Sequence, residues 1–296
     1  MAVFVGWVVY GVTHPPQRPY LVTPEKFAQL SNRGTKATDV TWPNRDGTQA
    51  RGWLLVGGEG APAVVLLHRY GADRSWVLNL GVKLNETLNY TVLWPDLRGH
   101  GENPPVATTT FGAREAEDVR SALVYLRSLK TPQGRPVAAE RIGVYGVELG
   151  AYAALIAARD EPQVRALVLD SLPETSDQML LDAVRENTGI ENSLLQQLAR
   201  GGARVYFLGD YRSVSACPVA ETLDDRRVLI LAGEDAPQLR ASSELLTKCF
   251  PNPANVEART NLPLTGFTLA SAPAEKGETY DQLVIAFFAR ALAATP

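Results

Sequence analysis

The feature that most constrains the fold is a regular alternation of short apolar runs with longer helical stretches. The runs are flanked by turn residues, which is typical of strands buried on both faces of a sheet. Alternation at this spacing implies right-handed crossovers, and it predicts an α/β fold with a doubly wound, mostly parallel sheet. The runs are Val64 to Leu67, Thr91 to Trp94, Ile142 to Tyr145, Val164 to Leu169 and Arg227 to Leu231, and the helical stretches are Arg74 to Leu88, Ala113 to Leu129, Leu149 to Arg159 and Pro237 to Cys249.

Residues 38–296 are expected to form one domain around this sheet, because a chain of 296 residues is long enough to bury one large core. Two β-rich runs, Thr38 to Trp42 and Ala50 to Val56, predict an antiparallel hairpin at a sheet edge. Tyr280 to Leu292 predicts a closing helix. The segment at about 171–225 is much longer than the other connections, and we interpret it as a small lid insertion.

Residues 1–37 are expected to be an N-terminal apolar segment followed by a proline-rich linker. Ala2 to Val12 carries no charge, but it is shorter than the roughly 20 residues that span a bilayer. Two interpretations stay open: a segment packed on the domain, or a membrane tether through residues 2–12. Basic residues such as Arg18 follow the segment, so a tether would leave the domain on the cytoplasmic side. The expected location is therefore cytoplasmic or membrane-associated.

Charge and cysteine content restrict the partners. The net charge of -3 is spread without long basic runs, which argues against nucleic acid. A small-molecule ligand or a protein is the expected partner, and no cofactor is predicted. Cys217 and Cys249 are only two and show no metal-ligand spacing, so a disulfide framework is not implied and a reducing compartment is favoured.

The motif that locates a site is Gly146-Val147-Glu148-Leu149-Gly150, which follows one predicted strand and opens an alanine-rich helix. This is the pattern of a nucleophile elbow, in which the central residue lies on a strained turn and the glycines allow close strand–helix packing. We therefore predict an unusual backbone conformation at Glu148.

Two further segments follow neighbouring strands: Leu66-Leu67-His68-Arg69-Tyr70-Gly71 and Asp96-Leu97-Arg98-Gly99-His100-Gly101. Together with the elbow, they resemble the oxyanion loop and a structural turn of bacterial serine esterases and lipases of the α/β-hydrolase superfamily. The resemblance covers roughly Thr38 to Leu292. The proline-rich lead-in is similar to that of membrane-anchored members.

The resemblance implies a role for each matching position. It places the nucleophile at Glu148, the oxyanion amides at Leu149 and at Arg69 or Tyr70, the acid at Ala236 or Asp235, and the histidine at Thr265. Serine is thus absent from the first position and histidine from the last.

The count of histidines points the same way. The chain has three, His14, His68 and His100, and none follows residue 100, whereas the base of this fold comes late in the chain. We expect His68 and His100 to bond loop backbone as structural residues. The leading hypothesis is a pseudoenzyme that binds a ligand or protein.

Alternatives to the pseudoenzyme remain. In one alternative the protein is an active hydrolase with an unconventional site centred on Glu148, since carboxylates serve as nucleophiles in some relatives. A metal site of Glu148, Asp96 and Asp235 is disfavoured because no histidine or cysteine joins it. In the plainest alternative, Glu148 simply points to solvent in a degenerate pocket.

Arg69 stands where similar hydrolases usually have glycine after the histidine of the oxyanion loop. A guanidinium there could reach a carboxylate at position 148, which would need a partner to stay charged when half-buried. We therefore hypothesise an Arg69–Glu148 ion pair that plugs the old site. The alternative is an Arg69 that points to solvent or meets Asp96.

Overall fold

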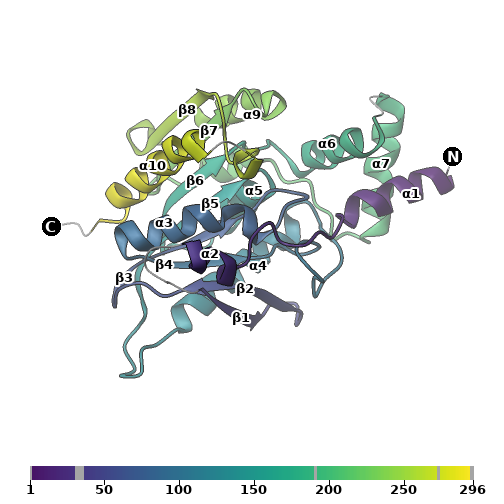
Figure 1. The fold of residues 1–296 in the computed structure, drawn as a ribbon. Coiled ribbons are helices and arrows are strands. Elements are labelled where there is room, and N and C mark those ends of the chain that lie inside the picture. Colours follow the sequence, from purple (N-terminus) through teal and green to yellow (C-terminus); the bar gives the residue numbers. More distant parts are fainter. Residues whose placement is uncertain (1, 31–36, 190–191, 272–273, 294–296) are drawn as a thin grey trace.

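The computed structural model describes residues 2–30, 37–189, 192–271 and 274–293. Its centre is an eight-stranded sheet in the order β1-β2-β4-β3-β5-β6-β7-β8 (Figure 1). Strands β3 to β8 run parallel, and the β1–β2 hairpin adds antiparallel to β4. This confirms the predicted α/β, mostly parallel sheet. The strands are β1 (Thr38–Pro43), β2 (Gln49–Leu55), β3 (Ala61–Leu67), β4 (Thr91–Pro95), β5 (Ala138–Val147), β6 (Val164–Asp170), β7 (Arg227–Gly233) and β8 (Val256–Leu262).

Helices cover both faces of the sheet, as expected for a doubly wound arrangement. One apolar cluster joins the sheet to α3 (Leu78–Leu88) and α10 (Ala274–Ala291). The other joins it to α4 (Ala113–Ser128), α5 (Leu149–Ala158) and α9 (Pro237–Thr247). A 3₁₀ turn, Arg74–Val77, precedes α3. Every parallel strand therefore ends at the same edge, where the elbow and the loops after β3, β7 and β8 meet.

Strand β8 was not predicted, and its sequence explains why. Its residues, Val256–Leu262, are exposed or only half-buried, because β8 is the edge strand and has one neighbour. Without two buried faces it has no continuous apolar run to detect. Helix α2 (Pro24–Leu30) and the two 3₁₀ turns Pro253–Asn255 and Leu269–Ser271 were also missed, since short helices leave little periodicity.

The N-terminal apolar segment forms helix α1 (Ala2–Thr13), which packs on the helices between β6 and β7. Val5, Val8, Val9 and Val12 face inward and are buried. A Cβ at Gly202 would lie 3.0 Å from Val9, so the small residue lets the helices approach closely. The interpretation of a packed segment is thus supported. Among the described residues, no helix has the length and apolar character needed to cross a membrane.

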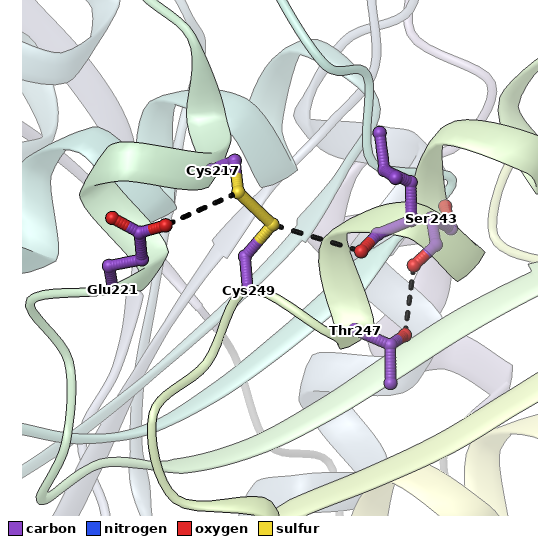
Figure 2. The surroundings of a disulfide bond; sticks show 6 residues. Cys217, Glu221, Ser243, Thr247 and Cys249 are labelled. Atoms are coloured by element: carbon purple, nitrogen blue, oxygen red, sulfur yellow. Dashed lines mark hydrogen bonds between the residues drawn. A yellow bond between two sulfur atoms is a disulfide. The ribbon is translucent and has the colours of Figure 1, made fainter.

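The insertion between β6 and β7 consists of α6 (Ser176–Thr188), α7 (Ser193–Tyr206) and α8 (Ala216–Ala220). Its end is fastened to the domain by a disulfide between Cys217 and Cys249 (Figure 2). The sequence analysis, in which the two cysteines implied no disulfide framework, therefore missed this bond. The two cysteines are 32 residues apart, but packing of α8 beside α9 brings their Cα atoms to 5.3 Å. The argument for a reducing compartment loses its basis, because disulfides persist mainly in oxidising ones.

Breaking this disulfide should lower the stability of the protein. Closing a loop of this length restricts the unfolded chain, and the chain-entropy estimate is about 4 kcal/mol, although measured values are often smaller. We expect Cys217→Ser/Cys249→Ser to shift the urea midpoint downward. Wild-type protein in reductant should show the same shift, whereas reductant should leave the double variant unchanged. Coincident unfolding curves for wild type with and without reductant would contradict the prediction.

Candidate active site

The site begins with the turn between β5 and α5, where glycines permit contacts that no side chain would. A Cβ at Gly146 would lie 2.3 Å from the backbone of Gly150, and one at Gly150 would lie 2.6 Å from the Leu67 carbonyl oxygen. Glu148, between them, has φ 49° and ψ -105°. The predicted strained conformation is confirmed, because this φ lies in the region that residues with a Cβ rarely adopt.

The Glu148 carboxylate points into the site rather than into solvent. The residue is 7% exposed, and its Oε2 accepts a hydrogen bond from the backbone N–H of Tyr70 at 3.0 Å. Tyr70 is one of the two positions at which the resemblance places an oxyanion amide. The elbow's own carboxylate therefore occupies a donor that, in a hydrolase, would stabilise negative charge on the substrate.

Burial dominates the electrostatics of Glu148. Desolvation raises the pKa of its carboxyl group from 4.5 to about 7, against the opposing effects of the Arg69 charge and the Tyr70 amide. Asp182 and Glu186 of α6 raise this pKa further through their negative charges. The group thus changes charge near neutral pH. The influence of α6 also shows that the insertion lies beside the elbow.

The histidines have other partners. His68 accepts a hydrogen bond from the Leu97 amide and bonds the Arg69 carbonyl, and His100 bonds the Arg98 carbonyl. Burial lowers the pKa of His68 to about 4 and that of His100 to about 3, so both rings are neutral at physiological pH. Both are structural residues that bond loop backbone, as predicted. Among the described residues, no histidine hydrogen-bonds Glu148.

The residues to which the resemblance assigns the acid and the histidine are in contact. Asp235, in the turn after β7, accepts hydrogen bonds from the Thr265 amide at 3.0 Å and from its hydroxyl at 2.9 Å. The Thr268 hydroxyl adds a third bond at 2.7 Å. Of the two candidates for the acid, Asp235 makes this contact, whereas Ala236 is buried at the start of α9. The acid therefore holds a threonine where similar hydrolases have histidine.

A second buried carboxylate, not identified from the sequence, lies next to the elbow. Asp170 ends β6, its carbonyl accepts the Glu148 amide, and its side chain accepts bonds from Ser171, Gly266 and Tyr280. Burial raises the pKa of Asp170 to about 7. An aspartate directly after an apolar run was the signal that could have revealed it.

The predicted Arg69–Glu148 ion pair is wrong as a direct contact. No nitrogen of Arg69 lies within 4.0 Å of an acidic oxygen among the described residues. The guanidinium instead lies between the rings of Trp76 and Phe267, 4.8 and 4.5 Å from their centroids, and donates to the Tyr70 carbonyl. Cation–π contacts of this kind fix a guanidinium without a carboxylate. Its charge acts on Glu148 only at longer range.

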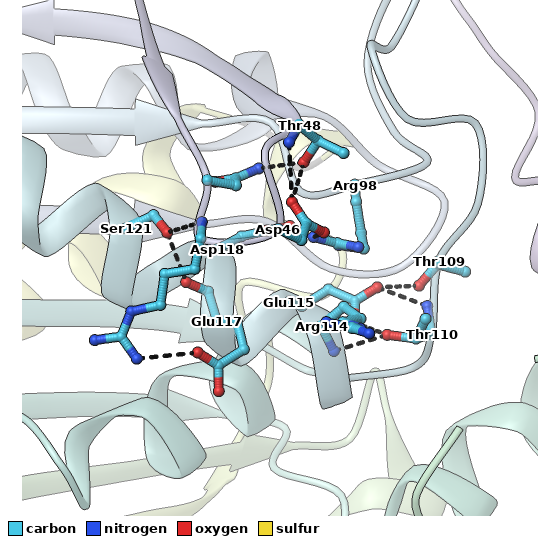
Figure 3. Close-up of polar contacts among 12 residues, drawn as sticks. Asp46, Thr48, Arg98, Thr109, Thr110, Arg114, Glu115, Glu117, Asp118 and Ser121 are labelled. Carbon is cyan, nitrogen blue, oxygen red and sulfur yellow. Dashed lines mark hydrogen bonds and ion pairs between the residues drawn. The ribbon is translucent and has the colours of Figure 1, made fainter. Parts of the chain in front are cut away.

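The wall beside Tyr70 is held by a buried carboxylate at the start of α4. Glu115 accepts hydrogen bonds from both Thr109 and Thr110, two of them through the hydroxyl groups (Figure 3). These bonds support the loop that carries Phe111, whose ring stacks on Tyr70 with centroids 5.5 Å apart. The Tyr70 hydroxyl donates to the carbonyl of Val12, so α1 is attached to the same loop.

Metal binding has no support in this geometry. Glu148, Asp96 and Asp235, the set considered above, are engaged with different partners. Within the described ranges, no group of three or more histidine, cysteine, aspartate or glutamate residues is arranged to hold a metal ion.

Comparison with solved structures identifies the architecture. The Pf2001 esterase of Pyrococcus furiosus superposes with a TM-score of 0.66 at 20% identity, covering 95% of this chain and 100% of that one. An esterase of Pyrobaculum calidifontis gives 0.58 at 20% identity, over 99% and 91% of the two chains. The chain has the α/β-hydrolase fold. Identities this low establish the fold and no more.

Sequence comparison adds one similar protein. The thiohydrolase aneE of Aspergillus aculeatus is 26% identical over 132 residues, which are 44% of this chain. The match spans only 40% of the length of that enzyme. No family model matches the chain.

The free energy of unfolding should depend on pH in a way that reveals the burial of the Glu148 carboxyl group. Its pKa is higher in the folded than in the unfolded protein, so ionisation opposes folding: the penalty is absent below about pH 4.5, grows as pH rises to about 7 and stays constant above that. Glu148→Gln keeps an oxygen for the Tyr70 amide but cannot ionise. Relative to wild type, it should gain about 2 to 3 kcal/mol of unfolding free energy between pH 5 and pH 8.

Urea unfolding at several pH values measures this gain. Glu174→Gln, at an exposed position, is the matched control and should follow wild type. Asp170 has a pKa shifted in the same direction, so part of the wild-type slope should persist in Glu148→Gln. Parallel curves for wild type and Glu148→Gln would show that Glu148 does not titrate as a buried group.

Proposed function

We propose that this protein is a pseudoenzyme with the α/β-hydrolase fold, which binds a small-molecule ligand or a protein instead of hydrolysing esters. The observation that carries the proposal is the hydrogen bond from the Tyr70 amide to the Glu148 carboxylate. An acyl substrate needs that donor for the oxygen that becomes negatively charged, and here a fixed carboxylate already holds it.

The remaining triad positions support the same proposal. Thr265 lacks a group that accepts a proton near neutral pH, so its contact with Asp235 cannot produce a general base. His68 and His100 are buried, neutral and bonded to loop backbone. A nucleophile would therefore have no base to activate it, and a covalent intermediate on Glu148 would have none to activate water.

The insertion over residues 171–225 acts, in this proposal, as a lid beside the ligand site. Its helix α6 places Asp182 and Glu186 where their charges influence Glu148. Arg69, with its guanidinium between Trp76 and Phe267, supplies a positive charge that lowers the pKa of Glu148. We place the ligand against Arg69, Tyr70, Glu148 and Leu149. Membrane association of residues 2–12 is part of the same proposal.

One observation favours the alternative of an active hydrolase. A carboxyl group with a pKa of about 7 is suited to general acid–base catalysis at neutral pH, so Glu148 could act on a substrate that does not need the oxyanion amide. The two functions differ in what Glu148 does, and mutation of that residue separates them.

Hydrolysis of short p-nitrophenyl esters and thioesters by wild type, Glu148→Gln and Glu148→Ala tests the proposal. We expect all three proteins to match buffer. Glu174→Gln controls for contaminating esterases, which would give equal rates in every preparation. Wild-type turnover that falls at least about tenfold in Glu148→Ala and Glu148→Gln would overturn the pseudoenzyme and establish Glu148 as catalytic.

Rebuilding the triad should create activity, because in this proposal Asp235 and the elbow occupy the positions of the acid and the nucleophile. We expect Glu148→Ser/Thr265→His to hydrolyse p-nitrophenyl acetate at least about tenfold faster than wild type, and each single variant to match wild type. Adding Asp235→Asn should lower the new rate. Fluorophosphonate labelling at position 148 gives a second readout, and near-ultraviolet circular dichroism confirms that a histidine is accommodated at the buried position 265.

A further inference from the structure

Three of the four residues that form the proposed ligand site are buried. Tyr70 is 6% exposed, Glu148 is 7% exposed and Leu149 is fully covered. The bond from the Tyr70 amide to the Glu148 carboxylate closes the site further, because it occupies the polar groups of both residues. A ligand can therefore reach these groups only after an element that covers them has moved.

Helix α1 lies between the loop that carries Tyr70 and the insertion. Its last two residues bond the walls of the site: the Val12 carbonyl accepts the Tyr70 hydroxyl at 2.8 Å, and the Thr13 carbonyl accepts the Thr109 amide at 3.0 Å. Its buried valines pack on α6 and α7 (Figure 1). Helix α6 in turn lies close enough to the elbow for its charges to raise the pKa of Glu148. Helix α1 therefore connects the insertion to the wall of the site.

Helix α1 is held by its surroundings more than by its own sequence. Gly6 and Gly11 lie within its 12 residues, and a Cβ added at either position would meet nothing within 4 Å. Packing does not require glycine there, although each glycine lowers the equilibrium for helix formation roughly fivefold relative to alanine. An isolated helix of this length is marginal in water. Helix α1 should therefore unwind once its valines leave α6 and α7.

The chain after α1 permits such a movement. Residues 14–19 form neither helix nor strand and contain three prolines. The next attachment to the domain comes at Tyr20, whose hydroxyl donates to Asp96 at 2.7 Å, and at Leu21, whose amide donates to the Ser75 hydroxyl at 3.0 Å. Helix α1 can thus detach while the chain from Tyr20 onward stays in place.

We propose that α1 is an autoinhibitory gate over the site. When α1 detaches, the Tyr70 hydroxyl loses the Val12 carbonyl, the loop that carries Tyr70 is released, and the Glu148 carboxylate becomes accessible. The open state exposes the four buried valines of α1 to water, so the closed state dominates at rest. The inference rests on the proposed function only in placing the ligand beside Glu148, and it holds for binding and for catalysis alike.

Hydrogen–deuterium exchange of the Tyr70 amide measures the opening, because this amide must leave the Glu148 carboxylate before it exchanges. In wild type it should exchange at least about tenfold faster than the amides at the centre of β5, which need global unfolding. Gly6→Ala/Gly11→Ala should slow it at least about tenfold, since both changes favour the helical, closed form of α1. Gly277→Ala, the same change in α10, is the matched control and should leave the Tyr70 amide unchanged.

A covalent lock between α1 and α7 tests the gate independently. A Cβ at Gly202 would lie 3.0 Å from a methyl carbon of Val9, so cysteines at these two positions are close enough to join. In oxidised Val9→Cys/Gly202→Cys, the Tyr70 amide should exchange at least about tenfold more slowly than in either single variant, because local opening then requires α7 to move as well. Peptide mapping verifies the new link and the intact Cys217–Cys249 bond.

Carbodiimide-driven coupling of glycine ethyl ester to Glu148 measures access to the site directly. The lock should lower the labelling of Glu148 at least about tenfold relative to the single variants, because the carboxylate is reached only from the open state. Glu174, which is exposed, should be labelled equally in all proteins and serves as the internal control. The measurement needs neither ester turnover nor a known ligand, so a failure of the proposed function leaves it interpretable.

Three results would overturn the gate. The first is a wild-type Tyr70 amide that exchanges no faster than the amides of β5. The second is exchange of this amide that either the two glycine substitutions or the lock leaves unchanged. The third is equal labelling of Glu148 in the locked and unlocked proteins, which would mean that the site opens by another route.

Discussion

The contact between β5 and α5 across the elbow is the constraint on which the site depends. Gly146 and Gly150 bring strand, turn and helix so close that a side chain at either position would overlap backbone atoms. The residue between them must then take a positive φ and direct its side chain to the carboxyl edge of the sheet. In this chain that residue is a glutamate. Its carboxylate meets the Tyr70 amide because the turn allows it little other direction.

The consequence is a site on an α/β-hydrolase scaffold in which two carboxylates are buried beside the elbow. Glu148 and Asp170 are both buried beside the elbow, and burial raises the pKa of each to about 7. Each accepts backbone amides, which reduces but does not remove the cost of desolvating a carboxylate. Asp235 accepts hydrogen bonds from the hydroxyl groups of Thr265 and Thr268. The carboxylates of Glu148, Asp170 and Asp235 therefore each bond a different part of the surrounding loops.

The pattern of apolar and turn residues along the chain was sufficient to predict those elements that are specified by residues close together in the sequence. Periodicity and turn residues predicted the parallel core strands, the β1–β2 hairpin and the helices that follow the strands. β8 did not, because an edge strand is buried on too little of its surface to need an apolar run. Helix α1 was identified as an apolar segment but not as a helix, since a sequence apolar on all sides carries no amphipathic period.

The sequence by itself determined the elbow with Glu148 at its centre, the absence of a histidine after residue 100 and the parallel core strands around the elbow. Only the tertiary structure decided which side chains contact one another. It joined Cys217 to Cys249 across 32 residues, placed the Arg69 guanidinium between two aromatic rings rather than on Glu148, and chose Asp235 over Ala236 as the neighbour of Thr265. The physical reason is that a turn is specified by residues adjacent in the chain. The partner of a long or distant side chain is specified by whatever the packing of other elements brings within a few ångströms.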